Sequence, residues 1–440
     1  MTRLAQFFSA LTVRGRCLLA AGVAASASAG VLHEINVLRI GVLLLALPVL
    51  AYVMVARTRY RLTCTRRLDP VRVAAGRPAE VRLRLQNVSR LPTGLMLAED
   101  TVPYLLGGRP RFVLDRVLPQ RAIDVDYTVR SQLRGRYRIG PLTVRLTDPF
   151  GLCELTRSFA SADTLVVTPQ VVPLPDVRLG GDWAGAGESR ARSVATSGED
   201  DAATREYRQG DDLRRIHWRS TARLGELMVR REEQPWQSRA VLLVDCRGSV
   251  HHGDGAASSL EWTMSAAASV GLHLSRGGFT MRVVTDAGDE VTTGSVGVDA
   301  FDSVLLDNLA VRTASATTSI RTGCTAVRRG GGEELLVAIV GPLSSEDAQS
   351  LSRIAQGGPS VGIGLVLDTA SWTTLAPRAA ASAARAHRET CDVLAAAGWR
   401  VLPVTAGASL AELWPATGAG LAAAAGREAA RLAAAAEVAG

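Results

Sequence analysis

The chain has 440 residues, of which 47% are hydrophobic, and this is enough to form two or three domains with their own cores. Its formal net charge is +8, but all 50 basic residues are arginine, which indicates a compositional bias rather than a surface built for polyanions. The six cysteines lie far apart with no CxxC pair, which excludes a dense disulfide framework and fits a reducing compartment.

Two uncharged runs near the N-terminus predict membrane-spanning helices. The first, "CLLAAGVAASASAGVL", covers residues 17–32, and the second, "IGVLLLALPVLAYVMVA", covers residues 40–56. A spanning helix needs about 20 residues, a length that the second run reaches if residues 37–39 join it. We therefore predict a transmembrane helical hairpin, with helices at about 17–35 and 37–56.

The hairpin, within residues 1–60, has two alternatives. Arg14 and Arg16 followed by an apolar stretch and "ASASA" also resemble a cleaved signal peptide, and both runs could instead be buried in a soluble core. For the hairpin, arginines follow the second run at Arg57, Arg59, Arg61, Arg66 and Arg67. The positive-inside rule then predicts a multi-pass protein of the cell membrane with everything after Ala56 in the cytoplasm.

Residues 61–176 have the two-residue period of half-buried strands. Apolar and polar residues alternate in "EVRLRLQN" (80–87) and again in "IDVDYTVR" (123–130). Turn signals containing Gly and Pro separate such runs. We predict an all-β, immunoglobulin-like sandwich domain over residues 61–176.

A different pattern follows a Gly-, Ser- and Ala-rich linker at 177–204. Short apolar runs alternate with helical segments, which is typical of a parallel sheet covered on both faces. The runs are "AVLLVD", "FTMRVVT", "ELLVAIVG", "VGIGLVLD" and "WRVLPV". We predict a Rossmann-like α/β domain over 205–416, and then an Ala-rich tail over 417–440 that has little to pack against.

The first of these runs ends in "VDCRGSV". Ligands of doubly wound sheets bind beyond the carboxyl ends of the strands, where a DxSxS motif would supply oxygen ligands for Mg²⁺. Asp245 and Ser249 fit that motif, but Arg247 occupies the middle position, cannot coordinate a cation and could pair with Asp245 instead. The sequence therefore favours a degenerate, unoccupied metal site and no cofactor, with Mg²⁺ as the one candidate.

Motifs of enzymes are absent from the sequence. It contains no GxSxG elbow, GxxxxGK loop, HExxH helix or GxGxxG after a strand. Asp286 and Asp368 also end strands, and His251 and His252 lie in a Gly-rich stretch that we expect to be a solvated loop. We expect no enzymatic activity, and a metal-dependent enzyme at the Asp245 edge is the alternative.

The most charged stretch is "REYRQGDDLRRIHWRSTARLGELMVRREEQ", residues 205–234. Its eight arginines and six carboxylates leave a local charge of only +2, which suits a cross-linked network better than a phosphate clamp. Asp211 or Asp212 can cap a helix over residues 213–224, with Gly225 as its stop.

Two residues of this expected helix are candidates for a role of their own. His217 shares an apolar stripe with its neighbours at helical spacing, so we expect it to face a core rather than to catalyse. Trp218 lies off that stripe beside Arg214 and Arg215, where cation–π stacking is possible. It either packs against the neighbouring β-domain or anchors an external partner, and we favour the anchor slightly.

The 205–234 segment resembles the signature of the domain of unknown function 58 family, and "RGRYRIGPLTVRLTDPFGL" (134–152) resembles that family's upstream signature. The resemblance implies two membrane segments, a β-rich region, a von Willebrand factor A-like fold and no enzymatic activity. It also implies association with MoxR-class AAA+ ATPases and transglutaminase-like membrane proteins. The matching positions are Arg205, Tyr207, Gly210, Asp211, Arg214, His217, Trp218, Arg223 and Glu232, and we add Arg215 as a partner-binding candidate. Many members carry DxSxS at the metal-dependent adhesion site, from which this chain departs at Arg247.

The sequence thus predicts a membrane-anchored, non-enzymatic interaction or assembly factor. Its cytoplasmic von Willebrand factor A-like domain would dock a protein partner, together with a MoxR-class ATPase. Anion or nucleic-acid binding through the Arg-rich segment is the first alternative, although we expect no nucleic-acid partner. A metal-dependent enzyme is the second.

Overall fold

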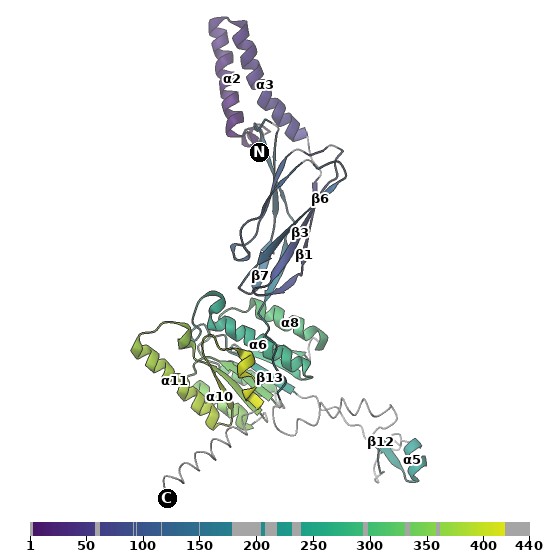
Figure 1. Cartoon of the computed structure of the whole chain (residues 1–440), viewed down its shortest axis with the longest axis vertical. Coiled ribbons are helices and arrows are strands. Elements are labelled where there is room, and N and C mark those ends of the chain that lie inside the picture. The colour runs from purple at the N-terminus through teal and green to yellow at the C-terminus, as the bar shows by residue number, and fades with distance from the viewer. Residues whose placement is uncertain are drawn as a thin grey trace. The chain divides into compact units, whose positions relative to one another are not determined.

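The computed structural model describes residues 3–57, 62–177 apart from 91, 94, 116 and 149, and then 204–206, 218–230, 239–293, 298–330, 335–357 and 361–418. The chain divides into two compact units, Met1–Gln170 and Val171–Gly440 (Figure 1). Several sheets, helices between strands in the second unit and two apolar N-terminal helices confirm the predicted mixture of α and β structure.

Three helices open the first unit. They are α1 (Arg3–Ala10), α2 (Val13–Leu32) and α3 (Ile35–Arg57). Residues Val13–Leu32 and Ile35–Val55 are long and apolar enough to cross a membrane. Glycines let α2 and α3 pack closely, since a Cβ added at Gly22 would lie 2.8 Å from Cγ of Leu45 and one at Gly41 would lie 2.4 Å from Oγ of Ser26.

The helix boundaries differ from those predicted. α2 begins at Val13 rather than near residue 17, because Thr12 caps it by accepting a hydrogen bond from the Gly15 amide at 3.3 Å. It ends at Leu32 because His33 adopts a left-handed conformation with φ of 55°. The uncharged run predicted the apolar part of the helix, not the extra arginine-containing turn, since arginine is itself a good helix former. The eight residues of α1 are too few for a periodic signal.

Ten strands form the β-rich part of the first unit. They are β1 (Leu62–Asp69), β2 (Arg72–Ala74), β3 (Pro78–Asn87), β4 (Met96–Asp100), β5 (Arg111–Leu114), β6 (Ala122–Arg130), β7 (Gly135–Ile139), β8 (Leu142–Thr147), β9 (Glu154–Phe159) and β10 (Asp163–Thr168). The sheet orders are β1-β3-β6, β2-β10-β7 and β5-β4-β8-β9, and all pairs are antiparallel except β2 with β10.

A single core joins the three sheets. Along β3, Val81, Leu83 and Leu85 are fully buried while Arg82 and Arg84 are exposed, as the two-residue period predicts. These side chains pack with core residues of the other two sheets, including Ile139, Leu142, Val144 and Leu165.

The second unit is built on a six-stranded sheet. Its strands are β13 (Arg239–Val244), β14 (Thr280–Thr285), β15 (Glu290–Thr292), β16 (Leu335–Val340), β17 (Val361–Leu367) and β18 (Arg400–Val404). The order is β15-β14-β13-β16-β17-β18, and every pair is parallel except β14 with β15. All five predicted apolar runs are strands of this sheet. The three-residue β15 was not predicted, because so short a strand has no pattern of its own.

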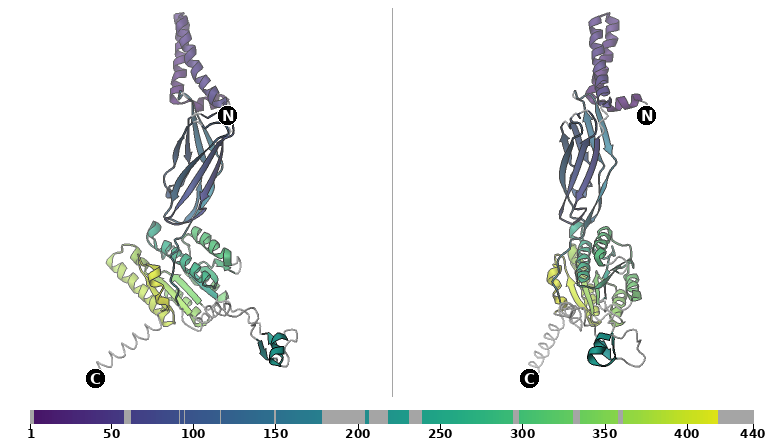
Figure 2. Two further views of the ribbon diagram at one scale, coloured as in Figure 1. Left: turned by 45° about the vertical axis from the view of Figure 1, so that its right-hand side comes forward. Right: turned by 90° about the vertical axis from the view of Figure 1, so that its right-hand side faces the viewer.

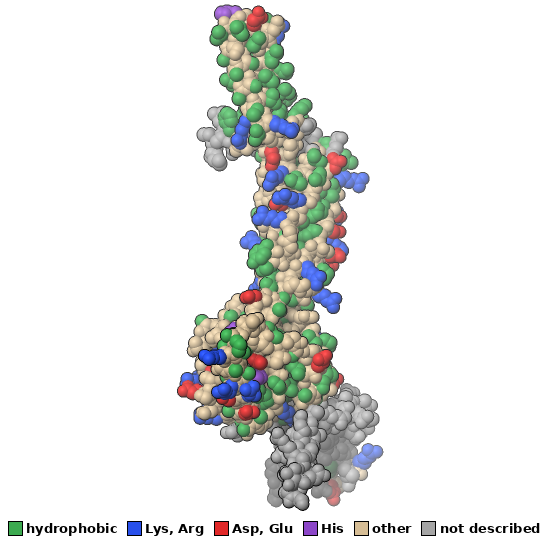
Figure 3. All heavy atoms as spheres, turned by 60° about the vertical axis from the view of Figure 1, so that its left-hand side comes forward, with side chains coloured by type: hydrophobic (Ala, Val, Ile, Leu, Met, Phe, Trp, Pro, Cys, Tyr) green, Lys and Arg blue, Asp and Glu red, His purple; other side chains and the backbone are tan. Residues whose placement is uncertain are grey.

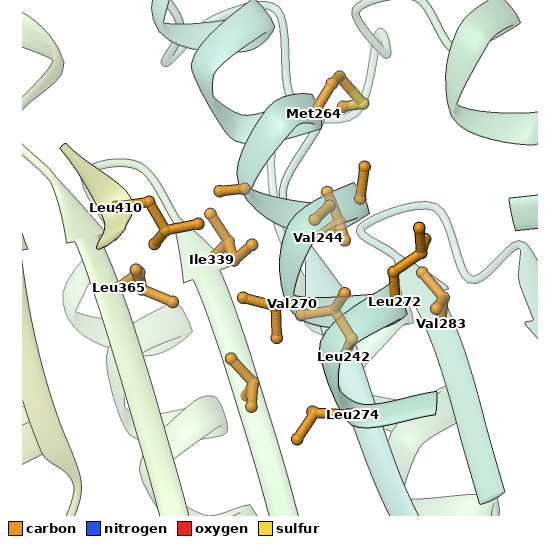
Figure 4. Close-up of a cluster of buried hydrophobic side chains, with 14 of the residues drawn as sticks. Leu242, Val244, Met264, Val270, Leu272, Leu274, Val283, Ile339, Leu365 and Leu410 are labelled. Atoms are coloured by element: carbon orange, nitrogen blue, oxygen red, sulfur yellow. The ribbon is translucent and has the colours of Figure 1, made fainter. Parts of the chain in front are cut away.

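Helices cover both faces of this sheet, as predicted. The helices are α6 (Ser259–Arg276), α8 (Val298–Val311), α9 (Arg321–Gly330), α10 (Ser345–Gly357), α11 (Pro377–Ala396) and α12 (Leu410–Leu413). Leu242 and Val244 of β13 pack in one core with α6, α8 and α12, and Figure 4 shows the α6 side of this core. Val241 and Leu243 pack in the opposite core with α9, α10 and α11. A strand buried on both faces must be apolar at every position, which explains its continuous run.

The boundary between the units falls earlier than predicted. Val171, Leu174 and Val177 pack against the core of the second unit, and the Val172 amide donates to Oγ of Ser269 on α6 at 2.9 Å. Residues 171–176 therefore belong with the α/β domain rather than the sandwich. The predicted linker at 178–203 and the tail from residue 419 lie outside the described residues.

Candidate functional site

Charged side chains gather at the carboxyl edge of the six-stranded sheet. Asp245 follows β13, Asp286 follows β14, and Asp347 lies in the first turn of α10. All three are buried, with 0%, 0% and 2% of their surface exposed, and Arg247 is 2% exposed. Parallel strands end at one edge of the sheet, which is why residues far apart in the sequence meet here.

Arg247 forms a bidentate ion pair with Asp245. Nε of Arg247 donates to Oδ1 of Asp245 at 2.9 Å, and Nη2 donates to Oδ2 at 2.7 Å. Two backbone amides also donate hydrogen bonds to the Asp245 carboxylate. The Arg247 amide donates to Oδ1 and the Gly341 amide donates to Oδ2, both at 3.0 Å. The sequence had allowed this pairing as an alternative to a metal ion.

The geometry does not fit the metal ion that the family resemblance implies. A carboxylate has about four lone-pair positions, and four donors already use those of Asp245. Ser249, the other predicted ligand, is exposed on the turn. Within the described residues, no three His, Cys, Asp or Glu side chains are grouped so as to hold a metal ion.

The Arg247 guanidinium also connects neighbouring loops. Nη1 lies 3.5 Å from Oδ2 of Asp347 and donates to the carbonyl of Thr318 at 3.4 Å, and Nη2 donates to the carbonyl of Pro342 at 3.1 Å. Burial lowers the pKa of Arg247, but the hydrogen bond and charge of Asp245 outweigh it and the pKa is raised. Arg247 is therefore a permanent internal cation among three carboxylates.

Asp286 is the second strand-end carboxylate of this edge, and it too is engaged by hydrogen-bond donors. Its Oδ1 accepts from the Cys246 amide at 2.9 Å, and its Oδ2 accepts from the hydroxyls of Ser315 and Thr317. A pocket of about 350 Å³ opens beside it, lined also by Asp289 and Arg312. The two hydroxyl groups that donate to Asp286 belong to the loop between α8 and α9. The Asp286 carboxylate therefore holds this loop at the edge of the sheet.

His251 differs from the expected solvated residue. Its Nε2 lies 2.9 Å from the carbonyl of Asp245, and its Nδ1 lies 3.0 Å from Oγ of Ser259, which also accepts from the His252 amide at 2.9 Å. Burial lowers the pKa of His251, so the neutral ring fits both contacts with Nε2 as donor. His251 thus holds the loop that follows β13 against the end of that strand and the start of α6. This tertiary contact cannot be read from a Gly-rich sequence. His252, by contrast, is exposed as expected.

Sequence reasoning missed several residues of this edge. Asp347, Ser315, Thr317 and Gly341 carried no motif. A signal existed for one of them, since the Asp347 amide bonds to Oγ of Ser344 at 3.2 Å in a helix N-cap arrangement. The pattern "SSED" predicts a helix start there, but not that the side chain of Asp347 reaches Arg247.

The Arg-rich segment is described in part. β11 (Thr204–Glu206) pairs antiparallel with β12 (Met228–Arg230), which places Arg205 opposite Val229. Between these strands lies α5 (Trp218–Leu224), which is followed by the predicted stop Gly225 with φ of +77°, whereas residues 213–217 of the predicted helix lie outside the described residues. The side chain of Trp218 is 69% exposed, and Arg223 is exposed as well. The remaining predicted positions, Tyr207, Gly210, Asp211, Arg214, Arg215, His217 and Glu232, lie outside the described residues.

Comparisons with solved structures are weak. The CARDB domain of the PF1109 protein from Pyrococcus furiosus, solved with di-metal ions, is 16% identical and matches 24% of this chain and 91% of its own, with a TM-score of 0.18. The Pseudomonas fluorescens alkylpurine DNA glycosylase AlkC is 10% identical and matches 26% of this chain and 32% of its own, again with a TM-score of 0.18.

Comparison by sequence is more informative. "Uncharacterized protein YeaD" from Bacillus subtilis (strain 168) is 26% identical over 192 residues, which is 41% of this chain. The match spans only 47% of that relative's length. Residues 203–370 match the family described as "Protein of unknown function DUF58". This range contains the Arg-rich signature and much of the α/β domain, for which the family resemblance is confirmed. The upstream motif at 134–152 lies outside it.

Proposed function

We propose that this chain is a membrane-anchored, non-enzymatic interaction protein that docks a protein partner through its second unit, as part of an assembly with a MoxR-class AAA+ ATPase. A transglutaminase-like membrane protein is a further proposed member of that assembly. The hairpin of α2 and α3 provides the anchor, and the large C-terminal part is cytoplasmic.

The membrane part of the proposal draws on both helices and their flanks. α2 and α3 have the length and composition of membrane spans, and many of their apolar side chains are exposed, including Val42, Leu43 and Leu50. The arginines that follow α3 favour the cytoplasm for the rest of the chain. A reporter fused after Gly440 should therefore give a cytoplasmic signal, and an external signal would contradict this orientation.

We assign the second unit to the von Willebrand factor A-like class. A five-stranded parallel sheet with one antiparallel edge strand, covered by helices on both faces, supports this assignment. So does the location of Asp245 and Asp286 at the carboxyl edge. The buried carboxylates of this edge accept hydrogen bonds from donors within the protein, which supports the non-enzymatic part of the proposal.

The observation that carries the docking proposal is the exposure of Trp218. Its side chain is 69% exposed and so available to a partner, and tryptophan and arginine are enriched among the residues that dominate binding energy at interfaces. Trp218 lies within the family-matched range, in the segment that also presents the exposed Arg223.

Crosslinking in native membranes followed by recovery of the full-length chain tests this proposal. The unmodified chain should recover a specific partner, and a Trp218→Ala, Arg223→Ala variant should lose it. Tyr104→Ala is a matched control, because Tyr104 is an exposed aromatic residue (85%) in the first unit. Equal loss from both variants, or no loss from either, would contradict docking through this segment.

The two alternatives give different outcomes. Binding to an anion or nucleic acid through several arginines would weaken steeply as salt is raised, because each phosphate contact releases counterions. A metal-dependent activity would require a bound metal that is removed by Asp245→Ala. Either result would replace the docking proposal.

A further inference from the structure

The loop between β8 and β9 is joined to the base of the helical hairpin. The Thr12 amide donates to the carbonyl of Leu152 at 2.9 Å, and Oγ1 of Thr12 donates to the carbonyl of Gly151 at 2.8 Å. Cys153 is fully buried and its Sγ lies 3.7 Å from the carbonyl of Pro48 on α3. A Cβ at Gly15 would lie 2.3 Å from the Leu152 oxygen, so this contact requires glycine.

An internal carboxylate keeps this loop folded. Oδ1 of Asp148 accepts from the Cys153 amide at 2.5 Å, and Oδ2 accepts from the Phe150 amide at 3.0 Å. Asp148 is only 5% exposed, so the loop does not present its negative charge outward. Gly151 has φ of +68°, a conformation that glycine adopts without strain.

The contact lies at the depth of lipid headgroups if α2 crosses the membrane. The uncharged run of α2 begins at Cys17, so Thr12 lies about five residues, or roughly 7 Å, outside it. The headgroup layer on each side of a bilayer is about 5–7 Å thick. Leu152, bonded to Thr12, therefore lies near the outer limit of the headgroup layer, whereas Cys153, beside Pro48 within the apolar run of α3, lies closer to the acyl chains.

Exposed apolar and basic side chains surround this contact. Phe150 is 58% exposed, Phe8 of α1 is 55% exposed and Leu155 of β9 is 40% exposed. Arg14 and Arg16 are exposed on the first turn of α2. Figure 3 shows hydrophobic side chains along the hairpin and arginines at its base, and in the right-hand view of Figure 2 α1 extends to one side from that base.

We propose that α1 and the 148–153 loop form a lipid-facing foot in the headgroup layer, with Phe8, Phe150 and Leu155 toward the acyl boundary and the two arginines toward anionic headgroups. The proposal rests on the membrane insertion of the hairpin proposed above. Arginine suits this layer because its side chain combines an apolar stem with a charged head, and phenylalanine and leucine are the apolar side chains that interfacial helices bury at the acyl boundary. The foot fixes the sandwich at the membrane surface instead of leaving it on a free tether.

Site-specific photo-crosslinking in native membranes tests the foot. The full-length chain carries the photoreactive amino acid benzoylphenylalanine at Phe150, at Leu43 or at Tyr104, one position at a time, and adducts are identified by mass. Leu43 reports insertion of the hairpin, because it is 59% exposed on α3. Tyr104 is the matched negative control. It follows Asp100, which pairs with Leu142, so it lies at the opposite end of the four-stranded sheet from the loop.

The proposal predicts phospholipid adducts at Phe150 and Leu43 and none at Tyr104. A repeat with the probe at Phe8 should give the same lipid adduct as Phe150, which guards against a local distortion of the loop. Lipid adducts at Leu43 but not at Phe150 or Phe8 would overturn the foot and leave the membrane anchor standing. An adduct to a protein at Phe150 would overturn it in favour of a partner surface. Absence of lipid at Leu43 would overturn both the anchor and the foot.

Discussion

Replacement of Arg247 by methionine removes the internal cation and keeps most of the side-chain volume. Asp245 is then left fully buried with two backbone amides and no opposite charge in place of the present bidentate pair. Breaking a buried pair by removal of one partner typically destabilises a protein by about 3–5 kcal/mol. For a domain of this size that corresponds to a fall in melting temperature of about 6–20 °C.

Intrinsic tryptophan fluorescence of the full-length chain measures this effect selectively, because all seven tryptophans lie at residue 183 or beyond. The matched control is Arg321→Met, whose pair with Glu346 at 2.9 Å is exposed and should contribute at most about 1 kcal/mol. The double variant Asp245→Asn, Arg247→Met should recover much of the lost stability, since neither charge remains. If Arg247→Met unfolds no earlier than Arg321→Met, the buried pair of Arg247 with Asp245 contributes no more to stability than an exposed pair, contrary to this prediction.

Mg²⁺ should give no saturable rise in the melting temperature of the unmodified protein, and a rise abolished by Asp245→Ala would contradict our account of that site. Gly15→Ala should loosen the loop from the hairpin and increase protease cleavage near residues 148–153. The control Gly30→Ala should not, because no atom lies within 4 Å of its added Cβ. Equal cleavage in both variants would exclude the close contact at Gly15 as the cause. Because burial lowers the pKa of His251 in the folded state, unfolding takes up a proton below about pH 6.5 and stability falls as the pH drops. His251→Gln should flatten that part of the pH curve, and an unchanged curve would show that His251 is not responsible.

Periodicity was sufficient to predict most of the elements. The alternation in 80–87 correctly indicated a strand with one polar face, and the continuous apolar run at 240–244 correctly indicated a strand that is buried on both faces. Short or terminal elements escaped, because α1 and β15 are too brief to show a period. The helix boundaries differ from those predicted where a capping hydrogen bond or a left-handed residue decides them, as Thr12 and His33 do for α2.

The candidate site could be predicted only where its residues are close in sequence. Asp245 and Arg247 stand two positions apart at a strand end, so their pairing could be foreseen from chemistry alone. Asp347 and the hydroxyl donors to Asp286 reach the same edge through separate loops, and no local pattern encodes that convergence. His251 was misjudged for the same reason, since its partners are a strand-end carbonyl and a helix serine.

Thermal stability and partner affinity of the single variant Trp218→Ala test the docking claim most directly. Because Trp218 is 69% exposed, the variant should melt within about 0.5 kcal/mol of the unmodified protein. Its affinity for the recovered partner should fall by about 2 kcal/mol or more, which is roughly 30-fold. Lost stability with unchanged binding per folded molecule would contradict the account, because Trp218 would then be a packing residue rather than an anchor.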